Sequence, residues 1–141
     1  MKPENDQEKN ILIINRVYPP DSGASGAYVR DLASGLAADG WQVTVLTAGR
    51  SVGRDPVDGV TLKTTGFGGG PIRAWIYPFI WVALTVRLMA MVVMRRFDLI
   101  LVCSDPPLID WSAVLVGRLR GIPVVHWAQD LYPELIPLVL P

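Results

Sequence analysis

The chain has 141 residues and equal numbers of basic and acidic side chains, 13 of each, so its formal net charge is zero. This balance excludes the basic footprint of a nucleic-acid-binding protein. One cysteine and one histidine exclude an internal disulfide and a multi-histidine metal site, so we expect no metal. Half of the residues are hydrophobic, which is enough to form one domain with a buried core.

The N-terminal residues, MKPENDQEKN, are polar and lack the apolar run of a signal peptide. We therefore expect a frayed tail at residues 1–10. The folded domain is predicted to span residues 11–141.

The segment from Ile11 to Thr47 predicts a strand, a loop, a helix and a second strand. Ile11–Ile14 is a short apolar run between two asparagines, which is typical of a strand buried on both faces. A loop rich in Pro, Gly and Ser, Tyr18–Gly26, precedes apolar residues at helical spacing, and Gly40 follows where a helix can end with positive φ. The second strand is expected at Gln42–Leu46. The Gly loop then lies at the N-terminus of a helix, which suits an anionic group such as a phosphate.

Three weaker signals come next. The polar segment Ala48–Asp58, which contains two glycines and a proline, predicts a loop and a tight turn. Val60–Lys63 predicts a third strand near a sheet edge. Gly66–Pro71 predicts a hinge.

The segment Ala74–Met94 is almost entirely apolar and is long enough to span a membrane. Arg87 within it, and its place between two strands of one sheet, argue against a span. We favour a helix packed on the sheet, with surplus apolar surface on a membrane or a partner; an ordinary buried crossover helix and a membrane anchor are the alternatives. The surplus surface is expected to be led by Trp75, Tyr77, Phe79 and Trp81, with Arg73, Arg95 and Arg96 near lipid phosphates.

The last third of the chain repeats the alternation of strand and helix. Leu99–Cys103 predicts the fourth strand, with Cys103 as buried filler. Asp110 is the expected N-cap of a helix that ends at Arg120. Ile122–Trp127 predicts the fifth strand.

Together these elements predict an α/β fold, a Rossmann-like doubly wound parallel sheet of about five strands in the order 3-2-1-4-5. Its switch point lies between the first and fourth strands, where ligands bind in such folds. The loops Tyr18–Gly26 and Ser104–Leu108 should flank this cleft. Three carboxylates, Asp21, Asp105 and Asp130, should approach it.

The motifs exclude some chemistries and leave others open. Gly23-x-x-Gly26 is not the dinucleotide fingerprint, and no G-K-[ST] follows any glycine run, so nicotinamide, flavin and P-loop enzymes are not expected and no cofactor is predicted. The two glycines could also form a turn without a ligand. His126 is either a general base or a hydrogen-bonded structural group. Asp130 could orient a substrate hydroxyl, accept a proton or cap the next segment, and Glu134 could line the cleft or cap a helix.

Residues 17–47, VYPPDSGASGAYVRDLASGLAADGWQVTVLT, resemble the opening of family 4 glycosyltransferases of the GT-B fold. The shared pattern is a Pro- and Gly-bearing loop, L-A-x-x-L, a Gly and V-x-V-L-T. Residues 98–100 and 104–107 resemble the fourth strand of that family and its exit. Residues 121–134 resemble the fifth strand of the branch that builds bacterial surface polysaccharides.

This resemblance implies the N-terminal, acceptor-side half of a retaining glycosyltransferase. Such an enzyme moves a sugar from a nucleotide sugar to a lipid-linked or polysaccharide acceptor. It implies that Ser22, Gly23 and Gly26 form the loop that touches the donor diphosphate. The nucleotide-binding C-terminal GT-B domain is absent from these residues, so this chain alone is not expected to transfer a sugar.

The resemblance also implies catalytic candidates after the fifth strand. Many members carry a histidine near the reacting sugar, and that position falls near Gln129, three residues beyond His126. Asp130 is the third candidate. The implied location is cytoplasmic, peripheral at the inner face of the plasma membrane. The alternative is a non-catalytic Rossmann-like subunit for membrane docking or assembly that needs a separate partner.

Overall fold

The computed structural model describes residues 9–21, 23–49, 53–54, 59–69 and 71–129. Most of the predicted polar tail lies outside these residues, as do Ser22, Asp130 and Glu134.

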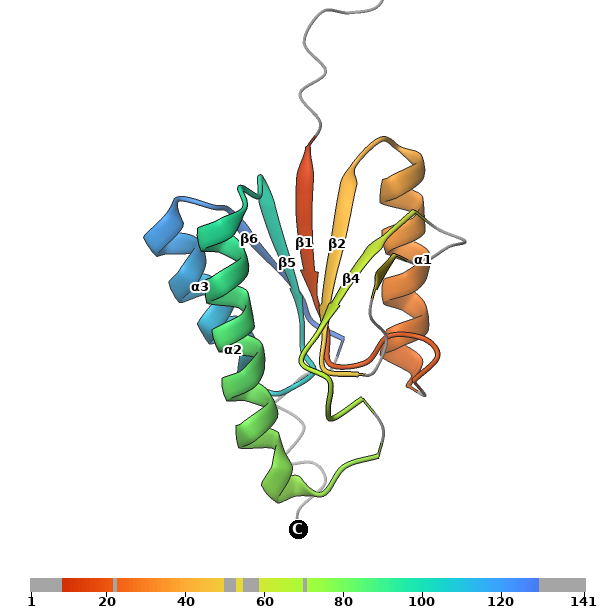
Figure 1. Cartoon of the computed structure of the whole chain (residues 1–141), viewed down its shortest axis with the longest axis vertical. Helices are drawn as coiled ribbons and strands as arrows, with labels where there is room; N and C mark the ends of the chain where they lie inside the picture. Colours follow the sequence, from red (N-terminus) through yellow and green to blue (C-terminus); the bar gives the residue numbers. More distant parts are fainter. Residues whose placement is uncertain (1–8, 22, 50–52, 55–58, 70, 130–141) are drawn as a thin grey trace, which may run out of the picture.

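A single six-stranded sheet forms the centre of the molecule, in the order β3-β4-β2-β1-β5-β6 (Figure 1). Helices α2 and α3 cover one face of the sheet and α1 covers the other (Figure 1). The strands are β1 (Asn10–Ile14), β2 (Gln42–Thr47), β3 (Gly53–Arg54), β4 (Thr61–Thr64), β5 (Leu99–Cys103) and β6 (Val124–Trp127). The helices are α1 (Ala24–Ala38), the 3-10 turn η1 (Ala74–Ile76), α2 (Tyr77–Met94) and α3 (Ile109–Arg120).

The five parallel strands confirm the predicted order 3-2-1-4-5. β1 pairs in parallel with β2 on one side and with β5 on the other, in the register Ile11 to Leu99 and Ile14 to Val102. β6 begins at Val124 rather than at residue 122, and Pro123 just before it has no backbone N–H to give to the ladder.

Two local predictions were wrong. Residues 53–54, expected in a loop, form the short strand β3, which pairs antiparallel with β4; two residues are too few to show an alternating pattern. Asp110 is not the N-cap of α3, because the helix begins at Ile109 and Leu108 takes the cap position with a left-handed φ of 67°. Asp110 instead lies in the first turn, where a carboxylate interacts favourably with the helix dipole.

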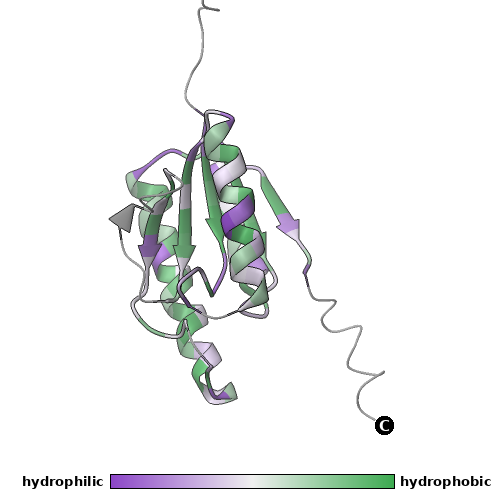
Figure 2. Ribbon diagram, turned by 90° about the vertical axis from the view of Figure 1, so that its right-hand side faces the viewer, coloured by the Kyte–Doolittle hydropathy of each residue, from purple (hydrophilic) through white to green (hydrophobic). Residues whose placement is uncertain are grey.

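The strand residues alternate between two cores. Ile11 and Ile13 of β1 pack on the α1 side, whereas Leu12 and Ile14 pack on the α2–α3 side. The strands are accordingly hydrophobic along most of their length, while α1 also carries hydrophilic positions (Figure 2). This is the pattern of a parallel sheet buried on both faces.

Helix α2 is covered on one side only. Five of its 18 residues are buried: Ile80, Leu84, Leu88, Met91 and Val92. Residues 74–94 form a helix that is long and apolar enough to cross a membrane by length and composition. The prediction of a helix packed on the sheet with surplus apolar surface is confirmed, because Phe79, Val82, Val86 and Val93 are all more than half exposed. Of the residues expected to lead this surface, Trp75 and Phe79 are exposed, but Tyr77 and Trp81 are half-buried.

Cys103 is the last residue of β5 and is fully buried in the core on the α1 side of the sheet. Burial, followed by the nearby Asp105 charge, raises the pKa of its thiol to about 12. The thiol is therefore protonated at neutral pH and acts as an apolar packing group, as predicted.

Two helical glycines make a matched test of this packing. A Cβ on Gly117 in α3 would lie 2.8 Å from the Ile122 carbonyl oxygen and would overlap the Val124 side chain, whereas a Cβ on Gly35 in α1 meets nothing within 4 Å. We expect Gly117→Ala to lower the free energy of unfolding by about 1–3 kcal/mol through overpacking. Gly35→Ala should raise it by roughly 0.5–1 kcal/mol, because alanine loses less backbone entropy in a helix.

Urea denaturation of both variants measures the difference. A stabilised Gly117→Ala variant would show that α3 does not pack closely against the β6 entry.

Candidate functional site

The candidate site lies at the carboxyl edge, which we define as the edge of the sheet where the parallel strands end. Arg16, two residues after the end of β1, is at its centre. The Nε of Arg16 donates to both carboxylate oxygens of Asp105, at 2.9 and 2.8 Å, and its Nη1 donates to the Gly68 carbonyl at 2.9 Å. The backbone N–H of Arg16 also donates to the Asp105 carbonyl, at 2.8 Å. One side chain therefore joins the loops that follow β1, β4 and β5.

The Arg16–Asp105 pair is largely shielded from water. The two side chains are 13% and 19% exposed, and the Arg16 guanidinium lies 5.7 Å from the centre of the Tyr77 ring at the start of α2. A charge-assisted hydrogen bond in such a place contributes about 1.5–3 kcal/mol. Asp105, predicted as a cleft carboxylate, is thus already engaged in the ion pair.

Asp21 reaches the same loop from another direction. Its Oδ2 is buried and has no hydrogen-bond partner among the described residues. The carboxylate lies against the backbones of Gly49 and Gly69, where a Cβ on either glycine would overlap it. Because Gly68 binds Arg16 and Gly69 contacts Asp21, the structure brings the predicted residues Asp21 and Asp105 to one loop.

The start of α1 is tied to the end of β1 by Asn15. This residue is fully buried, and its Nδ2 donates to the Val17 carbonyl at 2.8 Å and to the Ser25 Oγ at 3.4 Å. Its Oδ1 has no partner within the described part of the chain. Asn15 therefore fixes where the α1 N-terminus lies relative to the carboxyl edge.

The two loop glycines have different surroundings. Gly23 is exposed and takes the N-cap position of α1 without a side-chain cap. Gly26 is buried, its N–H donates to the Gly23 carbonyl at 3.1 Å, and a Cβ on it would lie 3.3 Å from the Val17 carbonyl oxygen. Gly26 thus lets α1 approach the backbone at residues 17–18, while Gly23 borders the first helical turn, where N–H groups lack partners within the helix.

The β6 exit brings a further predicted residue to this edge. The backbone N–H of Gln129 donates to the Ser104 Oγ at 3.0 Å, next to Asp105. Both polar atoms of the Gln129 carboxamide are buried, and neither has a hydrogen-bond partner among the described residues. His126 does not join them, because it is exposed within β6, opposite Val102.

The predictions from sequence missed Asn15 and Arg16, which hold the edge together. Their one signal is position, since both are polar residues directly after a buried strand. A lone arginine in a loop gives no motif, and its partner Asp105 is 89 residues away in the chain.

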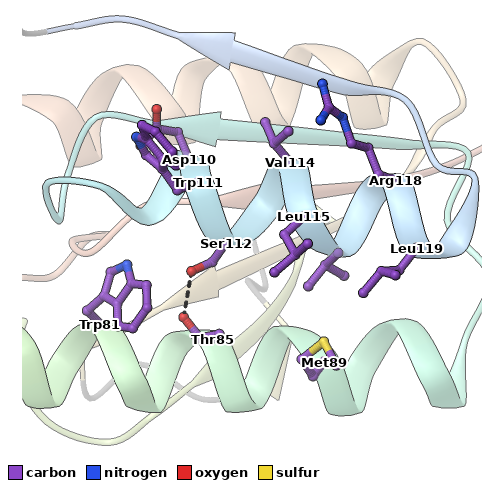
Figure 3. Close-up of a pocket in the computed structure, with 11 residues that line it drawn as sticks. Trp81, Thr85, Met89, Asp110, Trp111, Ser112, Val114, Leu115, Arg118 and Leu119 are labelled. Carbon is purple, nitrogen blue, oxygen red and sulfur yellow. Dashed lines mark hydrogen bonds between the residues drawn. The ribbon is translucent and has the colours of Figure 1, made fainter.

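An apolar groove of about 790 Å³ lies outside this edge, between α2 and α3 (Figure 3). The close-up shows Trp81, Thr85 and Met89 of α2 opposite side chains of α3 (Figure 3). The predictions from sequence did not include this groove, because it needs two helices to meet in space.

Among the described residues, the carboxyl edge offers groups that can form hydrogen bonds. It presents amide donors at the α1 N-terminus, a carboxylate oxygen at Asp21 and a carboxamide at Gln129. These groups can bind and orient hydroxyls and an anion. Among the described residues no group of three or more His, Cys, Asp or Glu could hold a metal ion.

Comparison with solved structures supports the fold. Two crystal structures of the C-terminal domain of PF1911 hydrogenase from Pyrococcus furiosus superpose with TM-scores of 0.58 and 0.57, each at 16% sequence identity. The first match covers 90% of this chain and 98% of that domain, and the second covers 88% and 95%. At this identity the likeness concerns the fold alone. No curated protein matches the sequence.

The sequence itself matches one family over most of its length. The match to the glycosyl transferase 4-like domain runs from residue 23 to residue 138 and so includes α1, the β5 exit and Gln129. Together with the Rossmann-like sheet, this match confirms the resemblance to family 4 glycosyltransferases: the chain belongs to the family of glycosyl transferase 4-like domains.

Proposed function

We propose that this chain is the acceptor-side half of a retaining glycosyltransferase that moves a sugar from a nucleotide sugar to a lipid-linked or polysaccharide acceptor. The observation that carries the proposal is the family match over residues 23–138, which begins at the exposed N-cap of α1. The polar groups that the carboxyl edge presents are of the kinds such a transfer needs.

The donor diphosphate is proposed to approach the N-terminus of α1. This helix has 15 residues, no side-chain cap and no acidic residue in its first turn. An anion can therefore accept hydrogen bonds from N–H groups in its first turn. Gly23 borders this position, and Ser22, outside the described residues, precedes it. Gly26 supports the site by packing α1 onto the β1 exit.

The acceptor is proposed to lie beside Gln129 and Asp21. The buried, unpartnered carboxamide of Gln129 can donate to one sugar hydroxyl and accept from another. Asp130, the next residue and the third catalytic candidate, lies outside the described residues. The nucleotide itself is proposed to be held by a second Rossmann-like domain facing this edge.

The transfer reaction is tested in the enzyme that contains both domains. Radiolabelled sugar from a panel of UDP-, GDP-, ADP- and dTDP-sugars should enter a lipid-linked or polymeric product, with the anomeric configuration of the donor retained. A Cβ on Gly23 would lie 2.9 Å from the Val17 Cγ2, so Gly23→Ala forces the N-cap to shift and moves the α1 amides with it. Losing one charge-assisted hydrogen bond to the donor in this way costs about 1.5–3 kcal/mol, so kcat/KM should fall roughly ten- to a hundredfold.

Gly35→Ala is the matched control, because it makes the same change inside α1, where a Cβ meets nothing within 4 Å. Its kcat/KM should equal that of the wild type. Absence of transfer from every donor would contradict the proposed function. Equal activity of both variants would show that the donor does not bind at the α1 N-terminus.

A peripheral contact with the inner face of the plasma membrane is proposed for residues 74–94. The exposed apolar side chains of α2 can enter the interface of a bilayer, and Arg73, Arg95 and Arg96 are all exposed beside them. The same surface would serve the alternative function, a non-catalytic docking subunit.

Flotation with vesicles tests this contact. The chain should float with phosphatidylglycerol vesicles at low salt, and alkaline carbonate should release it, because the helix lies on the bilayer without crossing it. High salt should weaken flotation by screening the arginines. Carbonate-resistant binding would instead indicate a spanning helix, and no flotation at low salt would contradict the membrane contact.

A further inference from the structure

The groove between α2 and α3 has the size and lining of a ligand site. Its volume of about 790 Å³ lies within the range of roughly 300–1,000 Å³ that small-molecule sites occupy. Its apolar side chains are large, and several are strongly exposed, including Trp111 at 72% and Leu119 at 69%. The main apolar lining residues are Trp81, Met89, Trp111, Val114, Leu115 and Leu119.

Several polar groups along the groove are already paired with the protein. The Nε1 of Trp81 donates to the Leu108 carbonyl at 3.1 Å, and the Thr85 Oγ1 donates to the Ser112 Oγ at 3.0 Å (Figure 3). These groups need no hydrogen bond from a ligand. A ligand would therefore be stabilised here chiefly by the burial of apolar surface.

The length of the groove suits one hydrocarbon chain. Its lining runs from Trp81 to Met89 on α2 and from Trp111 to Leu119 on α3, and eight residues at the helical rise correspond to about 12 Å. One leaflet of a bilayer contains about 15 Å of hydrocarbon. An acyl chain is thus of the right length and polarity.

Charged side chains near the groove favour one orientation of a bound lipid. Six arginines but one aspartate belong to residues 73–96 and 109–120, although the whole chain has 13 basic and 13 acidic side chains. Asp110 lies at the end of the groove where Trp81 and Trp111 also lie, and Arg118 lies at the end where Leu119 lies (Figure 3). Arg95 and Arg96 follow α2 at the Arg118 end.

We propose that this groove binds one acyl chain of an anionic membrane phospholipid, with the lipid phosphate at the Arg118 end. The inference rests on the membrane contact proposed above and adds a defined lipid site to it. The acidic end of the groove faces the carboxyl edge, because Leu108 bonds to Trp81 and follows Asp105 by three residues. The bound lipid is therefore an anchor whose charged head points away from the acceptor site.

A monomeric lipid probe distinguishes binding in the groove from binding to a bilayer. Dioctanoyl phosphatidylglycerol, used below its critical micelle concentration, should bind the 141-residue chain in calorimetric titrations, and dioctanoyl phosphatidylcholine should bind more weakly. Val114→Phe fills the groove, whereas Val86→Phe makes the same change on α2 outside its lining. Excluding about two methylene groups should weaken binding roughly tenfold in the first variant and leave the second unchanged.

A second matched pair tests the direction of the lipid. Arg118→Glu should weaken binding of the phosphatidylglycerol probe severalfold, while Arg87→Glu, which reverses an exposed charge outside the groove lining, should not. Circular dichroism melts of the four variants should match the wild type, and both Val→Phe variants should still float with vesicles.

Three results would overturn the lipid site. The first is an equal change in probe affinity for both variants of either matched pair. The second is flotation of the wild type without any binding of the monomeric probe. The third is a dimer in sedimentation that dissociates in Val114→Phe, which would show that a second copy of the chain covers the groove. Binding of the monomeric probe without flotation would instead support the lipid site and contradict the bilayer contact.

Discussion

The ion pair between Arg16 and Asp105 is the interaction on which the carboxyl edge depends. A Rossmann-like sheet places its loops at one edge, but the strands do not fix how those loops lie relative to one another. Here one guanidinium binds the β5 exit at Asp105 and the β4 exit at Gly68, and it lies over Tyr77 where α2 begins. Three connections are thereby fixed by one side chain that is 13% exposed. Removing either partner would leave a charge in a poorly solvated place.

The arrangement around this pair separates two kinds of surface. At the carboxyl edge, Asp21 and Gln129 keep buried polar atoms that no described residue satisfies, which is costly unless a ligand or water completes them. Along α2 and α3 the opposite holds, since Trp81 and Thr85 are satisfied and large apolar side chains are exposed. The first surface suits sugars and phosphates and the second suits hydrocarbon. The proposed transfer to a lipid-linked acceptor at a membrane would use both.

The sequence allowed the sheet to be predicted but only part of the site. The strand order followed from short apolar runs that alternate with helical spacing, because burial on both faces leaves a strong local pattern. Asp105 was recognised as a residue of the edge, yet its engagement by Arg16 depends on a contact across 89 residues that no local pattern encodes. The groove was missed for the same reason, and the left-handed Leu108 displaced Asp110 from its expected cap.

The most direct test of this account is a double-mutant cycle between Arg16 and Asp105, measured by urea denaturation. Arg16→Met keeps the aliphatic stem, and Asp105→Asn keeps the shape of the carboxylate. If the pair holds the carboxyl edge together, the two substitutions should be coupled by about 1.5–3 kcal/mol. In NMR spectra of both single variants, the backbone amide signals of Gly68 and Tyr77 should then shift. Effects that add within roughly 0.3–0.5 kcal/mol would show that the pair acts as an ordinary surface contact, and would contradict the account.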